Sequence, residues 1–182
     1  MAEIRLERAE DTPDCDAIVA AAFGPGRFAK SAYRLREGVR CVAALSFVAV
    51  EGTRIVGTVR YWPVMIGGQT ALMLGPIAIV ADRQGQGIAL ALMQQSLARA
   101  RELGHRAVVL VGDEPYYGRA GFARIKPAGR ITMPGPVDLS RLLGLALVED
   151  ALDALAGEVR KARLDVAVAA PGCALGAAPG PR

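Results

Sequence analysis

Leu74-Gly75-Pro76-Ile77-Ala78-Ile79-Val80-Ala81-Asp82-Arg83-Gln84-Gly85-Gln86-Gly87-Ile88-Ala89 is the stretch that decides the fold. It reads as an apolar strand that enters a glycine-containing turn, and an amphipathic segment follows from Leu90 to Leu103. The first backbone N–H groups of a helix have no helical partner, and the helix dipole places partial positive charge beside them. The stretch therefore predicts an anion site, with a pyrophosphate group as the expected guest.

The spacing of the glycines discriminates between known phosphate-binding patterns. A dinucleotide-binding Gly-x-Gly-x-x-Gly is broken at Leu90, and the lysine and hydroxyl of a Walker A loop do not follow Gly87. The spacing Gln84-x-x-Gly87-x-Ala89 instead resembles the pyrophosphate-binding motif of the GNAT superfamily of acyl-CoA-dependent N-acetyltransferases. Further along, Tyr116-Tyr117-Gly118-Arg119-Ala120-Gly121-Phe122 resembles the Tyr-x-x-x-Gly-Phe element of the same family.

The resemblance covers about residues 41 to 125 well and the two ends loosely. It implies an α/β fold of the α+β type, with a mixed, mostly antiparallel sheet that is splayed at its central strand and flanked by helices. It also implies acetyl-CoA as the acyl donor, with the pyrophosphate on Gln84, Gly85, Gln86, Gly87, Ile88 and Ala89. The pantetheine arm would pair with backbone at Ile77, Ala78 and Ile79. The acceptor would be a primary amine, of a small molecule, peptide or protein.

Turn residues and apolar periodicity divide the chain into elements. A proline cannot donate to a strand ladder, so Gly75-Pro76 predicts a bulge within its strand. A helix after Asp11 or Thr12 accepts Pro13 in its first turn, and Gly104 is a good cap for the helix over residues 87–103. Other expected strands cover residues 4–7, 46–51, 54–62, 69–80, 106–111, 131–133 and 142–147, and a second helix covers residues 28–37. In the resembling family the two early helices border the acceptor cleft.

Length and composition favour one domain. The 182 residues suit a single hydrophobic core over residues 1–165, followed by an Ala/Gly/Pro-rich and flexible tail over residues 166–182. No secretory signal or spanning segment is visible, and the net charge of +4 lacks a long basic run with aromatics. Three cysteines and one histidine have no metal-ligand spacing. We therefore expect a cytoplasmic protein without metal, nucleic acid or membrane partners, and a homodimer stays open.

Few side chains are needed for acyl transfer from a thioester to an amine. Tyr117 aligns with the tyrosine that many members of the resembling family place near the thioester sulfur as general acid, and the alternative for Tyr117 is packing. Candidate general bases are Glu51, Asp113 and Glu114, each acting through water, and Asp113 is also the expected N-cap of a short helix. No cysteine lies near either motif, which predicts direct attack without an acyl-enzyme.

Two other classes of function stay open. A non-catalytic acyl-CoA sensor or regulatory subunit would keep the fold and the binding loop. An interaction subunit with a vestigial loop would have no need of the spacing that Gln84, Gly87 and Ala89 retain. Acetyl-CoA binding and thiol-release assays on a panel of amines separate the three classes.

Overall fold

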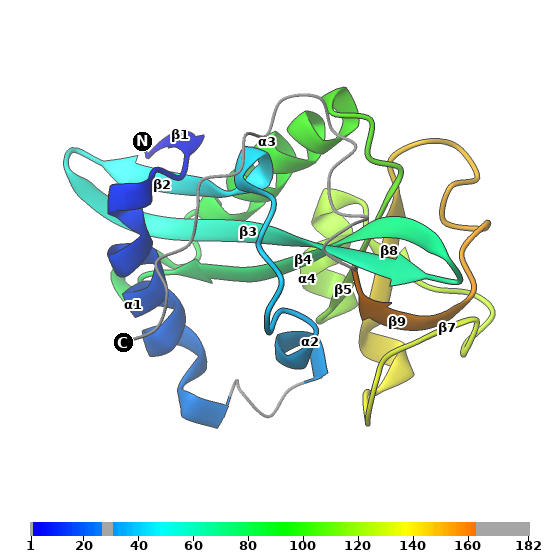
Figure 1. Ribbon diagram of the computed structural model, residues 1–182. Coiled ribbons are helices and arrows are strands. Elements are labelled where there is room, and N and C mark those ends of the chain that lie inside the picture. Colours follow the sequence, from blue (N-terminus) through cyan, green and yellow to red (C-terminus); the bar gives the residue numbers. More distant parts are fainter. Residues whose placement is uncertain (1, 27–30, 163–182) are drawn as a thin grey trace.

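Runs of alternating and aliphatic residues build one twisted central sheet, seen nearly edge-on in Figure 1. The computed structural model describes residues 2–26 and 31–162. The strands of that part are β1 (Glu3–Leu6), β2 (Phe47–Glu51), β3 (Arg54–Ile66), β4 (Gln69–Ile79), β5 (Ala107–Val111), β6 (Ala123–Arg124), β7 (Ile131–Thr132), β8 (Leu142–Ala146) and β9 (Gly157–Lys161). The helices there are α1 (Thr12–Phe23), α2 (Ser31–Arg34), α3 (Ile88–Glu102) and α4 (Glu114–Tyr117), with short 3-10 turns between elements.

The sheet is mixed and mostly antiparallel, as the sequence predicted. Its strands follow the order β1-β2-β3-β4-β5-β8-β6, and β9 pairs with the far end of β3. Within the described ranges, β4 runs parallel to β5 and β7 parallel to β9, while the other pairs are antiparallel. The chain passes from β4 through α3 to β5, which pairs in parallel with β4, so the motif-bearing stretch lies in a strand–helix–strand crossover.

The central strand bulges where the sequence predicted it. Tyr61 of β3 pairs with Leu74 and Val59 pairs with Ile77, so Arg60 alone stands opposite two residues of β4, Gly75 and Pro76. Before the bulge, β4 pairs with β5 at Leu72 and Met73, and after it β4 pairs with β3 alone among the described strands. The two halves of the sheet therefore part at residues 77–79, and this splay positions the candidate site.

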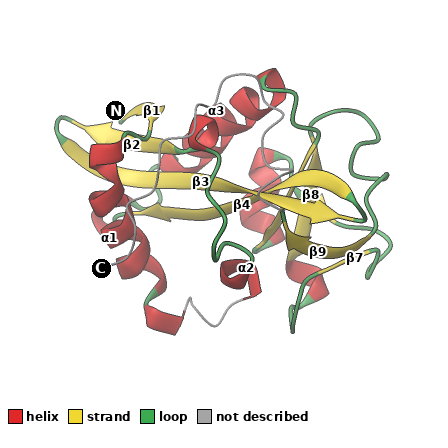
Figure 2. Cartoon of the chain, viewed as in Figure 1, coloured by secondary structure: helices red, strands yellow, loops and turns green. Residues whose placement is uncertain are grey.

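Helices cover both faces of the sheet, as Figure 2 shows: α3 lies on one face, and α1 and α2 lie on the other. Because successive strand residues point to opposite faces, Phe47 and Ala49 pack in the α3 cluster, whereas Val48 packs beside Cys15 of α1. The residues of α3 in that first core are Ile88, Leu92, Met93, Leu97 and Ala100. The buried Ser96 lies on the same helix, and its hydroxyl is 2.8 Å from the Tyr61 hydroxyl.

Helix α3 agrees closely with its predicted bounds. Its first residue follows Gly87, whose left-handed φ of 81° only glycine adopts without strain. At its end, the N–H groups of Gly104 and His105 donate to the carbonyls of Arg101 and Ala100, which is the hydrogen-bond pattern of a Schellman motif.

Three expectations differ from the structure. The second helix was expected over residues 28–37, whereas α2 spans Ser31–Arg34 and is followed by turns. Residues 27–30 lie outside the described part of the chain, and so does the expected tail over 166–182. Strand β3 runs on to Ile66, past the predicted end at residue 62. The Tyr61 carbonyl accepts a hydrogen bond from the Val42 N–H on the side away from β4. Residues two apart in a strand point their backbone groups to the same side, so the nitrogen of Pro63 also faces away from β4 and the pairing with β4 continues. Sequence patterning also missed the two-residue strand β6 and strand β9, in which Val159 is the single buried residue.

Candidate active site

The predicted anion loop is held in shape by polar contacts at its base. Asp82 accepts two hydrogen bonds from the Arg54 guanidinium, at 2.8 and 2.9 Å, which ties the loop to the start of β3. The Gln84 side-chain amide donates to the Ile79 carbonyl at 3.3 Å, and the Gln86 amide donates to the Asp82 carbonyl at 3.4 Å. These contacts leave the turn from Gln84 to Gly87 exposed at the N-terminus of α3.

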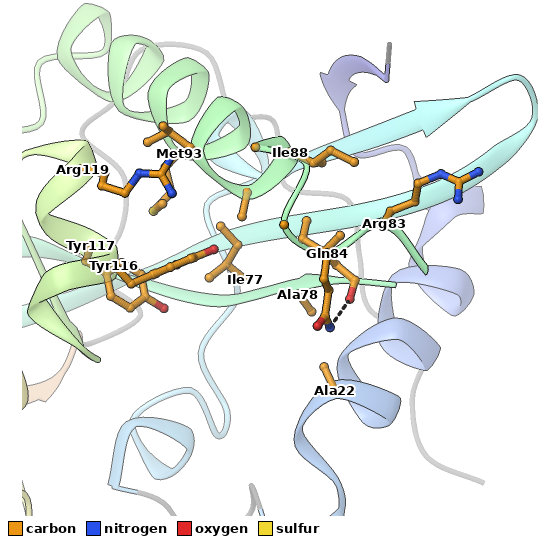
Figure 3. Close-up of a pocket in the computed structure, with 15 residues that line it drawn as sticks. Ala22, Ile77, Ala78, Arg83, Gln84, Ile88, Met93, Tyr116, Tyr117 and Arg119 are labelled. Atoms are coloured by element: carbon orange, nitrogen blue, oxygen red, sulfur yellow. Dashed lines mark hydrogen bonds between the residues drawn. The ribbon is translucent and has the colours of Figure 1, made fainter. Parts of the chain in front are cut away.

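A cavity of about 390 Å³ begins at this loop, and we call it the donor cavity. Figure 3 shows Arg83 and Gln84 at one end of it, Tyr116, Tyr117 and Arg119 at the other, and Ile77 between them. Of the nine predicted cofactor-binding residues, eight line the cavity: Ile77, Ala78, Ile79, Gln84, Gly85, Gly87, Ile88 and Ala89. Gln86 is the exception, and its side chain instead bridges to the Asp82 carbonyl at the base of the loop.

The free edge of β4 runs along the donor cavity. Val80 donates its N–H to Val56 on the β3 side, and backbone groups of successive residues in a strand point to opposite sides. Ile77 and Ile79 therefore direct their N–H and C=O groups away from β3, into the gap that the splay opens. The hydrogen bond from Gln84 to the Ile79 carbonyl lies on that side.

Tyr117 is fixed by close packing at the opposite end of the donor cavity. Its ring meets Phe122 edge-on at 6.2 Å between centroids, and a Cβ added at Gly112 would come within 2.2 Å of the ring. Burial raises the pKa of Tyr117 to about 12, although the cations Arg141 and Arg36 act in the opposite direction. The phenol is therefore protonated at neutral pH and is available as a hydrogen-bond donor.

A second cavity of about 530 Å³ adjoins the first, and we call it the acceptor cavity. Its walls come from α1, from α2 with the turn after it, from the bulge of β4, and from the loop before β8. Ile77 and Tyr117 line both cavities, so the two meet at the splayed strand and the phenol.

The three predicted base candidates lie outside both cavities. Glu51 accepts a hydrogen bond from Arg83 at 2.8 Å, and Glu114 pairs with Arg124 at 2.7 Å. Asp113 stands at the N-cap position of α4, but its carboxylate makes no cap hydrogen bond and lies 3.2 Å from Arg141. Asp113 is therefore the N-cap residue of α4 by position, as expected, but its carboxylate pairs with Arg141 and does not cap the helix.

Two charged residues of the acceptor cavity carried no sequence signal. Asp138 is a carboxylate on its wall, and hydrogen bonds from Ser140 lower its pKa. Arg36 lies in the turn after α2 and faces the same space. Both come from irregular segments whose side chains meet through the fold, so no spacing in the sequence joins them.

Within the described ranges, no cysteine lines either cavity and no group of side chains is placed to bind a metal ion. Cys15 is buried and burial raises the pKa of its thiol to about 11, while Cys41 is half-buried, and neither lines a cavity described above. Among residues 2–26 and 31–162 there is no group of three or more His, Cys, Asp and Glu side chains placed to hold a metal ion. In the same part of the chain no helix is long and apolar enough to cross a membrane.

Comparison with known proteins identifies the family. Residues 12–123 match the model of the acetyltransferase (GNAT) family, which is more than half of the chain. The chain is also 32% identical to the uncharacterised N-acetyltransferase YhbS of Escherichia coli K12, over 86% of this chain and 93% of YhbS. The chain therefore belongs to the GNAT acetyltransferase family, and the predicted enzyme class, an acetyl-CoA-dependent N-acetyltransferase, is confirmed.

Solved structures agree with this assignment. The crystal structure of Escherichia coli YhbS in complex with CoA superposes with a TM-score of 0.75 at 30% identity, covering 88% of this chain and 89% of that one. A GNAT acetyltransferase from Brucella melitensis in complex with acetyl-CoA gives a TM-score of 0.66 at 29% identity, covering 89% and 96%. The predicted fold is thereby confirmed.

Proposed function

We propose that this chain moves the acetyl group of acetyl-CoA to a primary amine by direct attack, with Tyr117 as general acid. The pyrophosphate lies on the amides of residues 84–89, and the pantetheine arm pairs with the free edge of β4 at Ile77 and Ile79. The related proteins whose structures contain CoA or acetyl-CoA support this choice of donor. No metal takes part in the proposed reaction.

One observation carries the proposal: the donor and acceptor cavities meet at Ile77 and Tyr117. A thioester at that junction is reached by an amine from the second cavity. The nitrogen attacks the carbonyl carbon, the C–N bond forms and the C–S bond breaks. The nitrogen loses a proton to water. Tyr117 donates a hydrogen bond to the departing thiolate, and its proton passes to the sulfur as solvent supplies the phenol with another.

The raised pKa of Tyr117 sets the size of its contribution. A thiol has a reference pKa of about 8.5, so a phenol with a pKa of about 12 holds its proton more tightly than the departing sulfur does. Tyr117 then helps chiefly by donating a hydrogen bond to sulfur as negative charge develops there. A positioned acid contributes about 10²- to 10⁴-fold in rate, and we expect the lower end of that range.

The test is Tyr117→Phe, which keeps the ring and its packing against Phe122. We expect kcat to fall by about 10²-fold, with the affinity for acetyl-CoA and the thermal midpoint unchanged. Thiol release over a panel of primary amines measures turnover, and calorimetry measures binding. Full turnover by the variant would assign Tyr117 to packing alone.

The same assay distinguishes the proposal from an acyl-CoA sensor. Glu51, Asp113 and Glu114 are all engaged in ion pairs outside the cavities, which is compatible with a chain that binds acyl-CoA without turnover. Tight acetyl-CoA binding with no thiol release for any amine would favour the sensor. Release above the rate of hydrolysis with one amine would favour the enzyme.

A further inference from the structure

Arg36 carries a half-buried charge without a counter-ion among the described residues. Its Nε is fully buried and has no hydrogen-bond partner, and no carboxylate among the described residues forms an ion pair with its guanidinium. Burial lowers the pKa of Arg36 to about 10, so the group is still cationic at neutral pH. Burying an unpaired charge is costly, and an arginine in that state is a candidate for binding an anion.

Aromatic contacts alone do not account for this placement. The guanidinium carbon lies 5.9 Å from the Trp62 ring centroid and 6.0 Å from that of Tyr33, at the outer limit of a cation–π contact. Trp62 donates its indole N–H to the Gly75 carbonyl at 2.7 Å, and Arg36 Nη2 would lie 2.9 Å from a Cβ added at Gly75. The guanidinium is thus held against the bulge of β4, beside the junction of the two cavities.

The acceptor cavity holds charges of both signs on a largely apolar wall. Asp138 is its one carboxylate among the described lining residues, and its cations are Arg34, Arg36 and Arg141. Arg34 is exposed and Arg141 is paired with Asp113, so Arg36 is the half-buried cation that faces the space without a carboxylate partner in the described part of the chain. Val19, Leu74 and Val137 contribute apolar surface to the same space. A ligand with an amine, a single negative charge and an apolar group matches this wall.

We propose that the acceptor is a small apolar amino acid whose carboxylate binds Arg36. This inference rests on the proposed function, because it names the acceptor of that same reaction. The planar guanidinium fits a carboxylate through two parallel hydrogen bonds. Arg36 lies against the bulge at Gly75 and Tyr117 lies where the two cavities meet, and both line the acceptor cavity, so a carboxylate on Arg36 is beside the junction at which the amine reacts. An α-amino acid has that spacing, whereas the carboxyl end of a peptide lies far from its N-terminal amine.

The experiment compares amino acids with their decarboxylated twins. L-leucine is set against isoamylamine and L-phenylalanine against phenethylamine, with the aminophosphonic analogue of leucine as a doubly charged probe. In an assay of thiol release from acetyl-CoA, kcat/KM should be at least about 30-fold higher for each amino acid than for the corresponding amine without the carboxylate. This ratio corresponds to the loss of binding energy expected when a charge in the site loses its partner. Equal rates for the twins, or a preference for the phosphonate, would overturn the proposal.

Variants then locate the preference. Arg36→Met keeps an apolar stem and should remove the preference through a higher KM, while the affinity for acetyl-CoA stays the same. Arg36→Lys keeps the positive charge but not the planar guanidinium, and it should therefore retain part of the preference for amino acids. A purely structural role of Arg36 would not give this partial preference. Arg99→Met is the control, since Arg99 of α3 is a paired arginine that is exposed and lines neither cavity. A preference that survives Arg36→Met, or that disappears equally in the control, would refute the assignment.

Product binding separates this inference from the proposed function. Calorimetry on the CoA-loaded protein compares N-acetyl-leucine with N-isoamylacetamide. If no amine is acetylated but N-acetyl-leucine binds more tightly in an Arg36-dependent way, the site stands and the catalytic proposal fails. If acetylation proceeds but the two products bind alike, the carboxylate site fails and the catalytic proposal stands.

Discussion

Two glycines at the ends of α3 provide a matched test of where acetyl-CoA binds. Gly87 and Gly104 have left-handed φ angles of 81° and 78°, and a Cβ added at either would find no atom within 4 Å. Replacing either by alanine therefore adds backbone strain without a clash, about 1–2 kcal/mol. For a chain of this size that lowers the thermal midpoint by about 2–8 °C in both variants.

The two variants should differ in ligand binding alone. Gly87 lines the donor cavity, so a methyl group there occupies the space through which a phosphate approaches the backbone amides. Losing one amide hydrogen bond to a charged group costs about 1.5–3 kcal/mol, which raises the Kd for acetyl-CoA by about 10- to 150-fold. Gly104→Ala should bind as the parent does, because Gly104 lies at the far end of the helix.

Calorimetric titration with acetyl-CoA measures both constants, and thermal unfolding without ligand checks that the strain is equal. The reasoning is refuted if Gly87→Ala loses the expected stability but binds acetyl-CoA as tightly as Gly104→Ala. The pyrophosphate would then lie away from this loop. Alanine is preferred to valine here, since a β-branched residue at positive φ would strain the loop enough to obscure the comparison.

Two further substitutions follow from close packing and from a lowered pKa. Gly112→Ala should displace the Tyr117 ring and reduce turnover, because its Cβ would come within 2.2 Å of that ring, whereas Gly118→Ala meets nothing and should be active in the same thiol-release assay. The hydrogen bond from Arg5, with that from the Arg8 N–H, lowers the pKa of Asp11 to about 2. A carboxyl with a lowered pKa stabilises the fold above its ordinary pKa of about 4, and this contribution disappears as the pH falls towards 2. Asp11→Asn should therefore cost about 1–2 kcal/mol at neutral pH and progressively less in acid, as measured by urea unfolding across that range; a constant difference would refute the linkage.

The parts of the fold that the sequence predicted are the local ones. A helix that starts after Gly87, ends at Gly104 and carries an apolar stripe can be read from neighbouring residues, as can the bulge at Gly75-Pro76. The strand bounds were less certain where pairing is decided at long range. Val159 alone does not make a strand pattern, and β9 forms because the end of β3 offers an unpaired edge.

The charged groups of the acceptor cavity could not be predicted for a related reason. Strands β2 to β7 lie between Arg36 and Asp138 in the sequence. The two residues share a cavity only because the turn after α2 and the loop before β8 meet over the splayed part of the sheet. The base candidates are the opposite case. Glu51 and Glu114 lie near the motifs in sequence, but arginines from other segments hold their carboxylates outside both cavities.

The bulge in β4 couples the two halves of the proposed reaction. By adding one residue opposite Arg60, it frees the backbone edge at Ile77 on the donor side. The same bulge brings Gly75 so close to Arg36 that a Cβ there would lie 2.9 Å from Nη2, and the φ of 123° at Gly75 is itself strained for any other residue. The bulge thus positions both the strand edge proposed to bind the donor and the arginine proposed to bind the acceptor. A side chain at Gly75 would therefore shift both, and the loss of acetyl-CoA affinity and of acceptor preference should appear together.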